Sequence, residues 1–212
     1  MAINVIDAIE YFDASSVSSI STPYEITAWD DRILIVTSPE SRATQATSVT
    51  YNWVALTKAT EVYNGNYGSV VYYLVNPPVW THTLTANFSA TVTFHLMHII
   101  YATGVDQTTP LWATNTKTGS AQTKSISVTT TQANSLLIDT LWANWGVHSV
   151  SWWQTYISNW WWNRATAYKI LTAAAWSETV SWTSTTFAAY WYVVAEFKEA
   201  VTINNWNFFN FF

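Results

Sequence analysis

The chain has 212 residues and a formal net charge of −5, and only 10% of its residues are charged. Its eight Lys and Arg residues are scattered along the sequence, which argues against a nucleic-acid partner. There is no cysteine, so disulfides and thiolate metal sites are excluded, and we expect neither a metal ion nor a cofactor. Thr and Ser fill most polar positions, which is typical of a chain rich in strands.

The apolar residues recur with a period of two almost throughout, as in half-buried strands. The pattern predicts short strands near 4–7, 24–28 and 47–52, a hairpin over 81–96 with its turn at Ser89, and further strands at 32–38, 69–75, 124–130, 135–141, 165–171, 178–184 and 189–197. Turn residues stand at 64–66, 76–78, 104–110 and 118–119. No segment has a convincing helical pattern.

Many short strands at this spacing are typical of a sandwich or a barrel. We predict an all-β fold, a single antiparallel β-sandwich of the jelly-roll-like or lectin-like kind, over residues 1–200. Residues 201–212 form a separate aromatic C-terminal tail.

The tryptophans stand where a β protein needs glycine. There are 15 Trp and only five Gly, although turns that require a positive φ depend on glycine. Trp53 follows Asn52, at the second position of a type I′ Asn-Gly turn. Trp80 lies between Pro77-Pro78-Val79 and a predicted strand, and Trp160 to Trp162 form a run between two asparagines.

With glycine at 53 and 80 the chain reads "SVTYNGVALT" over 48–57 and "YYLVNPPVGTHT" over 72–83. Together with "GVDQTTPL" at 104–111, "VSWT" at 180–183 and "YVVAEFK" at 192–198, this text resembles a β-sandwich module of phage, prophage and bacterial surface proteins. The resemblance spans about residues 3–200. It implies a sandwich on a particle or cell surface and supplies no catalytic residue. The chain departs from the family at its tryptophans, and only Trp182 stands where the family also tends to have one.

One hypothesis explains the departure. The codon UGA is read as glycine by some bacteria. If such a gene is translated with a code in which UGA means tryptophan, a subset of its glycines appears as Trp. Genuine tryptophans and deliberate engineering are the alternatives.

Two aromatic segments are candidate contact sites. If the tryptophans are genuine, Trp152, Trp153 and Trp160, Trp161 and Trp162 form a platform on which sugar rings stack, because a flat ring matches the apolar face of a pyranose. An exposed apolar patch of that size requires a partner. The tail carries Phe208, Phe209, Phe211 and Phe212, which we expect to dock into a neighbouring copy of the chain; packing across the end of its own sandwich is the alternative.

The polar residues give weaker signals. His95 and His98 point to opposite faces of a strand, so they cannot easily share a metal. Glu196 and Glu199 are expected at the surface. Asp106 is expected to cap its own loop, with a calcium ligand as the weaker alternative.

No nucleotide or nucleophile motif is present, and we therefore expect no enzymatic activity. The preferred function is a structural or adhesive module. The alternatives are a carbohydrate-binding lectin-like module and, more distantly, a glycoside-acting enzyme. No classical signal peptide and no membrane span are predicted, so we expect a virion or extracellular surface reached without such a signal.

Overall fold

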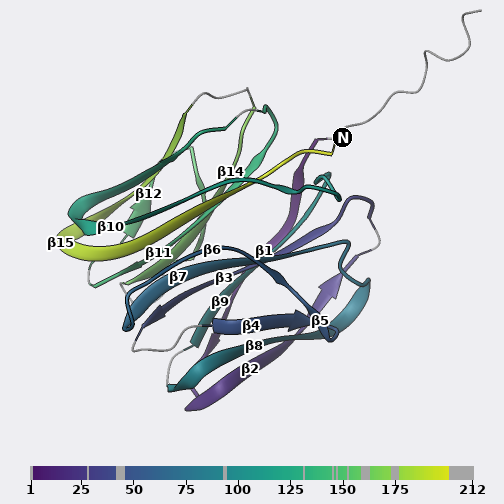
Figure 1. The fold of residues 1–212 in the computed structure, drawn as a ribbon, viewed down its shortest axis with the longest axis horizontal. Coiled ribbons are helices and arrows are strands. Elements are labelled where there is room, and N and C mark those ends of the chain that lie inside the picture. Colours follow the sequence, from purple (N-terminus) through teal and green to yellow (C-terminus); the bar gives the residue numbers. More distant parts are fainter. Residues whose placement is uncertain are drawn as a thin grey trace, which may run out of the picture.

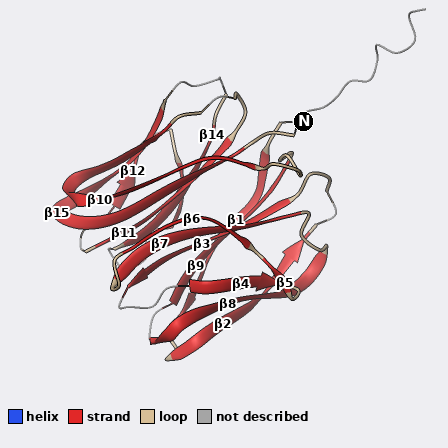
Figure 2. Ribbon diagram, viewed as in Figure 1, coloured by secondary structure: helices blue, strands red, loops and turns tan. Residues whose placement is uncertain are grey.

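The computed structural model describes residues 2–27, 29–41, 46–92, 95–130, 132–144, 146, 148–151, 153–158, 163–172 and 177–200. Every regular element in these residues is a strand, and all strand pairs are antiparallel (Figure 2). The predicted all-β antiparallel sandwich is therefore confirmed.

The first half of the chain forms two sheets that face each other (Figure 1). The five-stranded sheet has the order β1-β9-β3-β7-β6, and the four-stranded sheet has the order β2-β8-β4-β5. The strands are β1 (Asn4–Asp13), β2 (Val17–Ile26), β3 (Ile33–Ser41), β4 (Ala46–Tyr51), β5 (Val54–Ala55), β6 (Thr57–Tyr63), β7 (Tyr67–Val75), β8 (Trp80–Val92) and β9 (His95–Thr103).

The second half forms a six-stranded sheet in which β10-β15-β11-β14-β13 lie in that order and β12 pairs with β15. Its strands are β10 (Leu111–Val128), β11 (Leu136–Ala143), β12 (His148–Val150), β13 (Thr155–Ser158), β14 (Arg164–Ile170) and β15 (Glu178–Phe197). Residues 190–197 of β15 pair with β11, whereas residues 182–184 pair with β12.

The long strands β10 and β15 bend back on themselves. Asn115 Nδ2 donates to Ser127 O at 2.6 Å, and Lys117 Nζ donates to Ser125 O at 2.7 Å, so the two halves of β10 lie close together. These side chains satisfy carbonyls on the outer edge of the sheet, where unpaired backbone groups would otherwise be open to another strand. The bend lets one sheet enclose its own apolar core.

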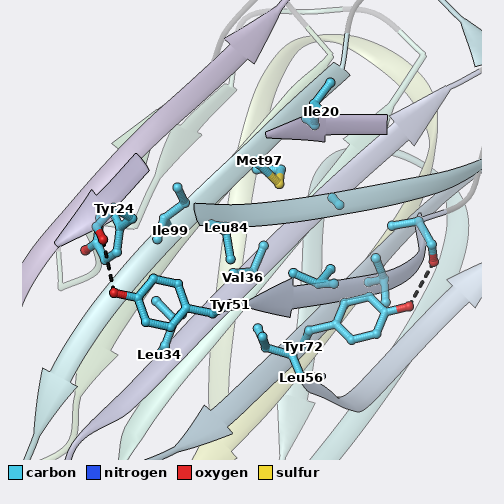
Figure 3. Close-up of a cluster of buried hydrophobic side chains, with 14 of the residues drawn as sticks. Ile20, Tyr24, Leu34, Val36, Tyr51, Leu56, Tyr72, Leu84, Met97 and Ile99 are labelled. Atoms are coloured by element: carbon cyan, nitrogen blue, oxygen red, sulfur yellow. Dashed lines mark hydrogen bonds between the residues drawn. The ribbon is translucent and has the colours of Figure 1, made fainter. Parts of the chain in front are cut away.

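Three apolar layers hold the sheets together. The first lies between the four-stranded and five-stranded sheets and contains Ile20, Leu84 and Ile99 (Figure 3). The second joins the five-stranded and six-stranded sheets and contains Ile35 and Ile138. The third lies inside the bent sheet, where side chains from both halves of β15 meet.

Strand β9 is buried along its whole length because it has a core on each face. Met97 and Ile99 face the first layer, whereas Ile100 and Ala102 face the second. This explains why the apolar residues of β9 form a continuous run. In a half-buried strand, apolar and polar residues would alternate.

Two predicted turns are wrong. Strand β8 continues through Ser89 to Val92, because both of its neighbours β2 and β4 continue to pair with it as far as Asn87 and beyond. The predicted turn at Thr118-Gly119 lies inside β10, where Thr118 pairs with Trp191 and Gly119 with Tyr190. Pairing with a long partner strand outweighs a local turn signal at both places.

Candidate functional site

The predicted tryptophan platform is described at one residue. Trp153 is 44% exposed, and Lys169 Nζ lies 5.6 Å from the centre of its ring. Trp152, Trp160, Trp161 and Trp162 lie outside the described residues, as do Phe208, Phe209, Phe211 and Phe212 of the tail.

A second exposed aromatic side chain follows Trp153 three residues later in the sequence. Tyr156 in β13 is exposed on one side, and its ring meets the buried ring of Trp182 edge-on, with 6.0 Å between centroids. Sequence reasoning did not nominate Tyr156. Its position three residues after Trp153 could have indicated a second aromatic contact residue, but the neighbouring tryptophans were the more prominent feature of the sequence.

A larger exposed aromatic group lies at one end of the four-stranded sheet. Trp53 is 95% exposed and Trp80 is 68% exposed, with Val54 also exposed beside the turn. The main chain near both tryptophans meets at this end of the sheet, because Asn52 N donates to Thr83 O at 3.1 Å and Tyr51 OH lies 2.7 Å from Trp80 O. Sequence reasoning treated these positions as glycines and not as a binding surface.

The backbone at both tryptophans lies in the left-handed region. Trp53 has φ of 67° and Trp80 has φ of 79°. This conformation costs a residue with a side chain roughly 1–2 kcal/mol, whereas glycine adopts it freely. The expectation that exposed tryptophans occupy glycine-like conformations is confirmed at 53 and 80; Trp145 and Trp160 to Trp162 lie outside the described residues.

The most perturbed acid is Asp139, which is fully buried inside the bent sheet. Its Oδ1 accepts hydrogen bonds from Trp182 Nε1 at 2.6 Å and Tyr192 OH at 3.0 Å, and its Oδ2 accepts one from Gln154 Nε2 at 2.7 Å. Burial raises the pKa of Asp139 to about 7, although the three donors favour the charged form.

The Asp139 cluster joins four parts of the second half. Asp139 belongs to β11, Trp182 and Tyr192 to the two halves of β15, and Gln154 to the segment before β13. Gln154 Oε1 also accepts a hydrogen bond from Ser181 N at 3.0 Å. A carboxyl with a pKa near neutrality suits proton transfer, but this one is enclosed by donors from the protein itself.

A second buried polar cluster joins the two halves of the chain. His98 Nδ1 lies 2.9 Å from Thr166 Oγ1 and 3.3 Å from Thr37 Oγ1, and Thr166 Oγ1 donates to Thr140 Oγ1 at 2.8 Å. Burial lowers the pKa of His98, while Glu10, with Oε2 3.7 Å from His98 Nε2, opposes the shift. His95 lies on the opposite face of β9 against Phe88, as predicted.

Lys124 is also fully buried. Its ammonium donates to Ser184 Oγ and lies 3.4 Å from Gln122 O, and burial lowers its pKa to about 8. Ser184 Oγ in turn lies 2.7 Å from Thr186 O. A lysine next to a serine is a combination found in hydrolases, but both side chains here are closed to solvent and support the irregular part of β15.

Two predictions about acids have opposite outcomes. Asp106 caps its loop as expected, since Oδ1 accepts from Thr108 N at 2.8 Å and Thr109 N at 2.9 Å. These hydrogen bonds hold the pKa of Asp106 below its usual value. The surface assignment of Glu196 is wrong: it is buried, Ser135 Oγ donates to it at 2.6 Å, and burial raises its pKa.

Within the described residues, no group of three or more His, Asp or Glu side chains is placed to hold a metal ion. The same part of the chain contains no helix long and apolar enough to cross a membrane. Comparison with protein-family models, with curated proteins and with solved structures found no match to this chain.

Proposed function

We propose that the chain is a non-enzymatic structural or adhesive β-sandwich module of a phage particle or a bacterial cell surface. The observation that carries this proposal is the structural role of Asp139, the buried acid whose pKa is closest to neutrality. All three of its hydrogen bonds come from side chains of the same sandwich, and they tie β11, both halves of β15 and the segment at 154 together.

The other buried ionisable groups support the same proposal. His98 connects β9 with β3 and β14 across the layer between the two halves of the chain. Lys124 connects β10 with β15. Polar groups that link layers give a rigid scaffold, and a rigid scaffold presents its loops to a partner at little entropic cost. The resemblance of the glycine-restored text to phage and bacterial surface modules agrees with this use.

A carbohydrate-binding module is the second candidate, and the exposed pair Trp153 and Tyr156 favours it. Exposed aromatic rings are a common surface for sugars, because a flat ring matches the apolar face of a pyranose. Lys169 beside Trp153 adds a donor for hydroxyl groups.

A glycan array distinguishes the two candidates. We expect that Trp153→Ala does not reduce the binding of any glycan on the array. The matched control is Trp112→Ala, because Trp112 is also exposed and also has a lysine over its ring, Lys198 at 4.6 Å. Glycan binding that Trp153→Ala abolishes and Trp112→Ala preserves would establish the carbohydrate-binding candidate instead.

Location tests the proposed module directly. An antibody raised against the chain should label intact particles or intact cells of its source. Labelling that requires cells to be permeabilised, together with absence from purified particles, would contradict a surface module.

A further inference from the structure

The two most exposed tryptophans of the described chain, Trp53 and Trp80, share one property that the buried tryptophans lack. Both have a positive φ, and no other tryptophan in the described residues does. The surrounding main chain and core impose this conformation at each position.

At Trp53 the conformation follows from the length of the hairpin. Tyr51 pairs with Val54, so Asn52 and Trp53 alone connect β4 to β5. A two-residue connection of this kind is a type I′ turn, which needs a positive φ at both residues. The observed values are 48° and 67°. Asparagine tolerates the first position, and glycine is the residue that suits the second.

At Trp80 the conformation is held by a core tyrosine. Tyr51 is fully buried, and its hydroxyl lies within hydrogen-bond distance of two carbonyls, Trp80 O at 2.7 Å and Tyr24 O at 3.0 Å. Trp80 also pairs with Ile26 across β2 and β8. The main chain at 80 is therefore positioned through its own carbonyl and its strand pairing, and the Trp80 side chain remains 68% exposed.

Trp182 shows what a genuine tryptophan looks like in this fold. It is 0% exposed, and its Nε1 donates to Asp139. The cavity, the hydrogen-bond acceptor and the ordinary backbone all fit an indole. Backbone conformation and burial thus distinguish Trp53 and Trp80 from Trp182, whereas Trp29, Trp112 and Trp153 are exposed without a positive φ.

We propose that residues 53 and 80 are glycine in the protein as its source makes it, and that both are encoded by UGA read as glycine. The chain keeps only five other glycines, and under this proposal these are encoded by standard glycine codons. This inference goes beyond the proposed function and does not depend on it. One consequence is that the end of the four-stranded sheet with Trp53 and Trp80 is not a ligand surface: residue 53 belongs to a tight turn and residue 80 to the start of β8.

Peptide mass spectrometry of the protein purified from its source tests the proposal. Trypsin cleaves after Arg42 and Lys58, so residue 53 lies in the peptide 43–58. Residue 80 is read from overlapping peptides made with a second protease, and Trp182 is the internal control. We expect glycine at 53 and 80, tryptophan at 182, UGA codons at the first two positions and UGG at 182. Tryptophan at 53 and 80 in the native protein, or UGG codons there, overturns the proposal.

Discussion

The indole of Trp182 donates a 2.6 Å hydrogen bond to the carboxylate of Asp139 in the interior of the bent sheet. The two residues are 43 positions apart in the sequence, and their contact closes the two halves of β15 over β11. This bond anchors the second half of the sandwich.

Asp139→Asn should remove a pH dependence of stability. The folded-state pKa of about 7 lies above the ordinary value of 3.8, so the contribution of Asp139 to stability is fully present below about pH 4 and is lost as the pH rises to about 7. The loss across this range is on the order of 4 kcal/mol.

Urea unfolding of both proteins from pH 4 to pH 8 measures this effect. The difference between the two profiles isolates Asp139, since His98 and other groups titrate equally in both. A difference that does not change with pH would contradict a buried acid that is neutral at low pH.

Thr166→Val should destabilise the fold by about 1–3 kcal/mol, because it removes the hydroxyl that joins His98 and Thr140 in a buried layer. The matched control is Thr179→Val, which also removes a hydroxyl bonded on a strand, at 2.8 Å to Ser127 Oγ, but at an exposed site. The control should change the free energy of unfolding by less than about 0.5 kcal/mol. Equal effects of the two substitutions would show that the cluster around His98 does not hold the halves together.

Ser184→Ala and Lys124→Met should differ in their effect on stability. The alanine leaves the buried ammonium of Lys124 without its closest acceptor and should cost about 1–3 kcal/mol. The methionine removes the charge and fills a similar volume, so it should cost less or nothing. Thermal unfolding at pH 7 makes the comparison. If Lys124→Met proves the more harmful of the two, the ammonium stabilises the fold more than its burial costs.

The fold class could be predicted because its signal is local. The alternation of apolar and polar residues around Leu84, Ala86 and Phe88 indicates a buried face directly. All three residues lie in the first apolar layer. The Asp106 cap could be predicted for the same reason, since its partners are two and three residues away.

The layout of the sheets could not be read in this way. The predicted strands 178–184 and 189–197 are one bent strand, and whether a strand bends or ends depends on partners far away in the sequence. Glu196 was placed at the surface because its neighbours Lys198 and Glu199 are charged. Its burial depends on Ser135, which is 61 residues away.

The Asp139 cluster was missed for a similar reason. Asp139 stands in the apolar segment 135–141, and an acid there signals either a surface face or a satisfied buried group. Only the fold brings Gln154, Trp182 and Tyr192 to it.

The unfolding free energy of the double variant Trp53→Gly, Trp80→Gly tests most directly the claim that this scaffold is built around glycine turns. Relief of the left-handed strain is worth about 1–2 kcal/mol at each position, and the flexibility of glycine in the unfolded chain offsets about half of it, so the pair should be more stable by about 1–2 kcal/mol. The control is Trp112→Gly, an exposed strand position without a positive φ, which should lose stability. Urea denaturation of the three proteins gives the comparison. A double variant that is less stable than the parent chain, with a loss like that of the control, would show that the two indoles belong to the fold and would contradict the account.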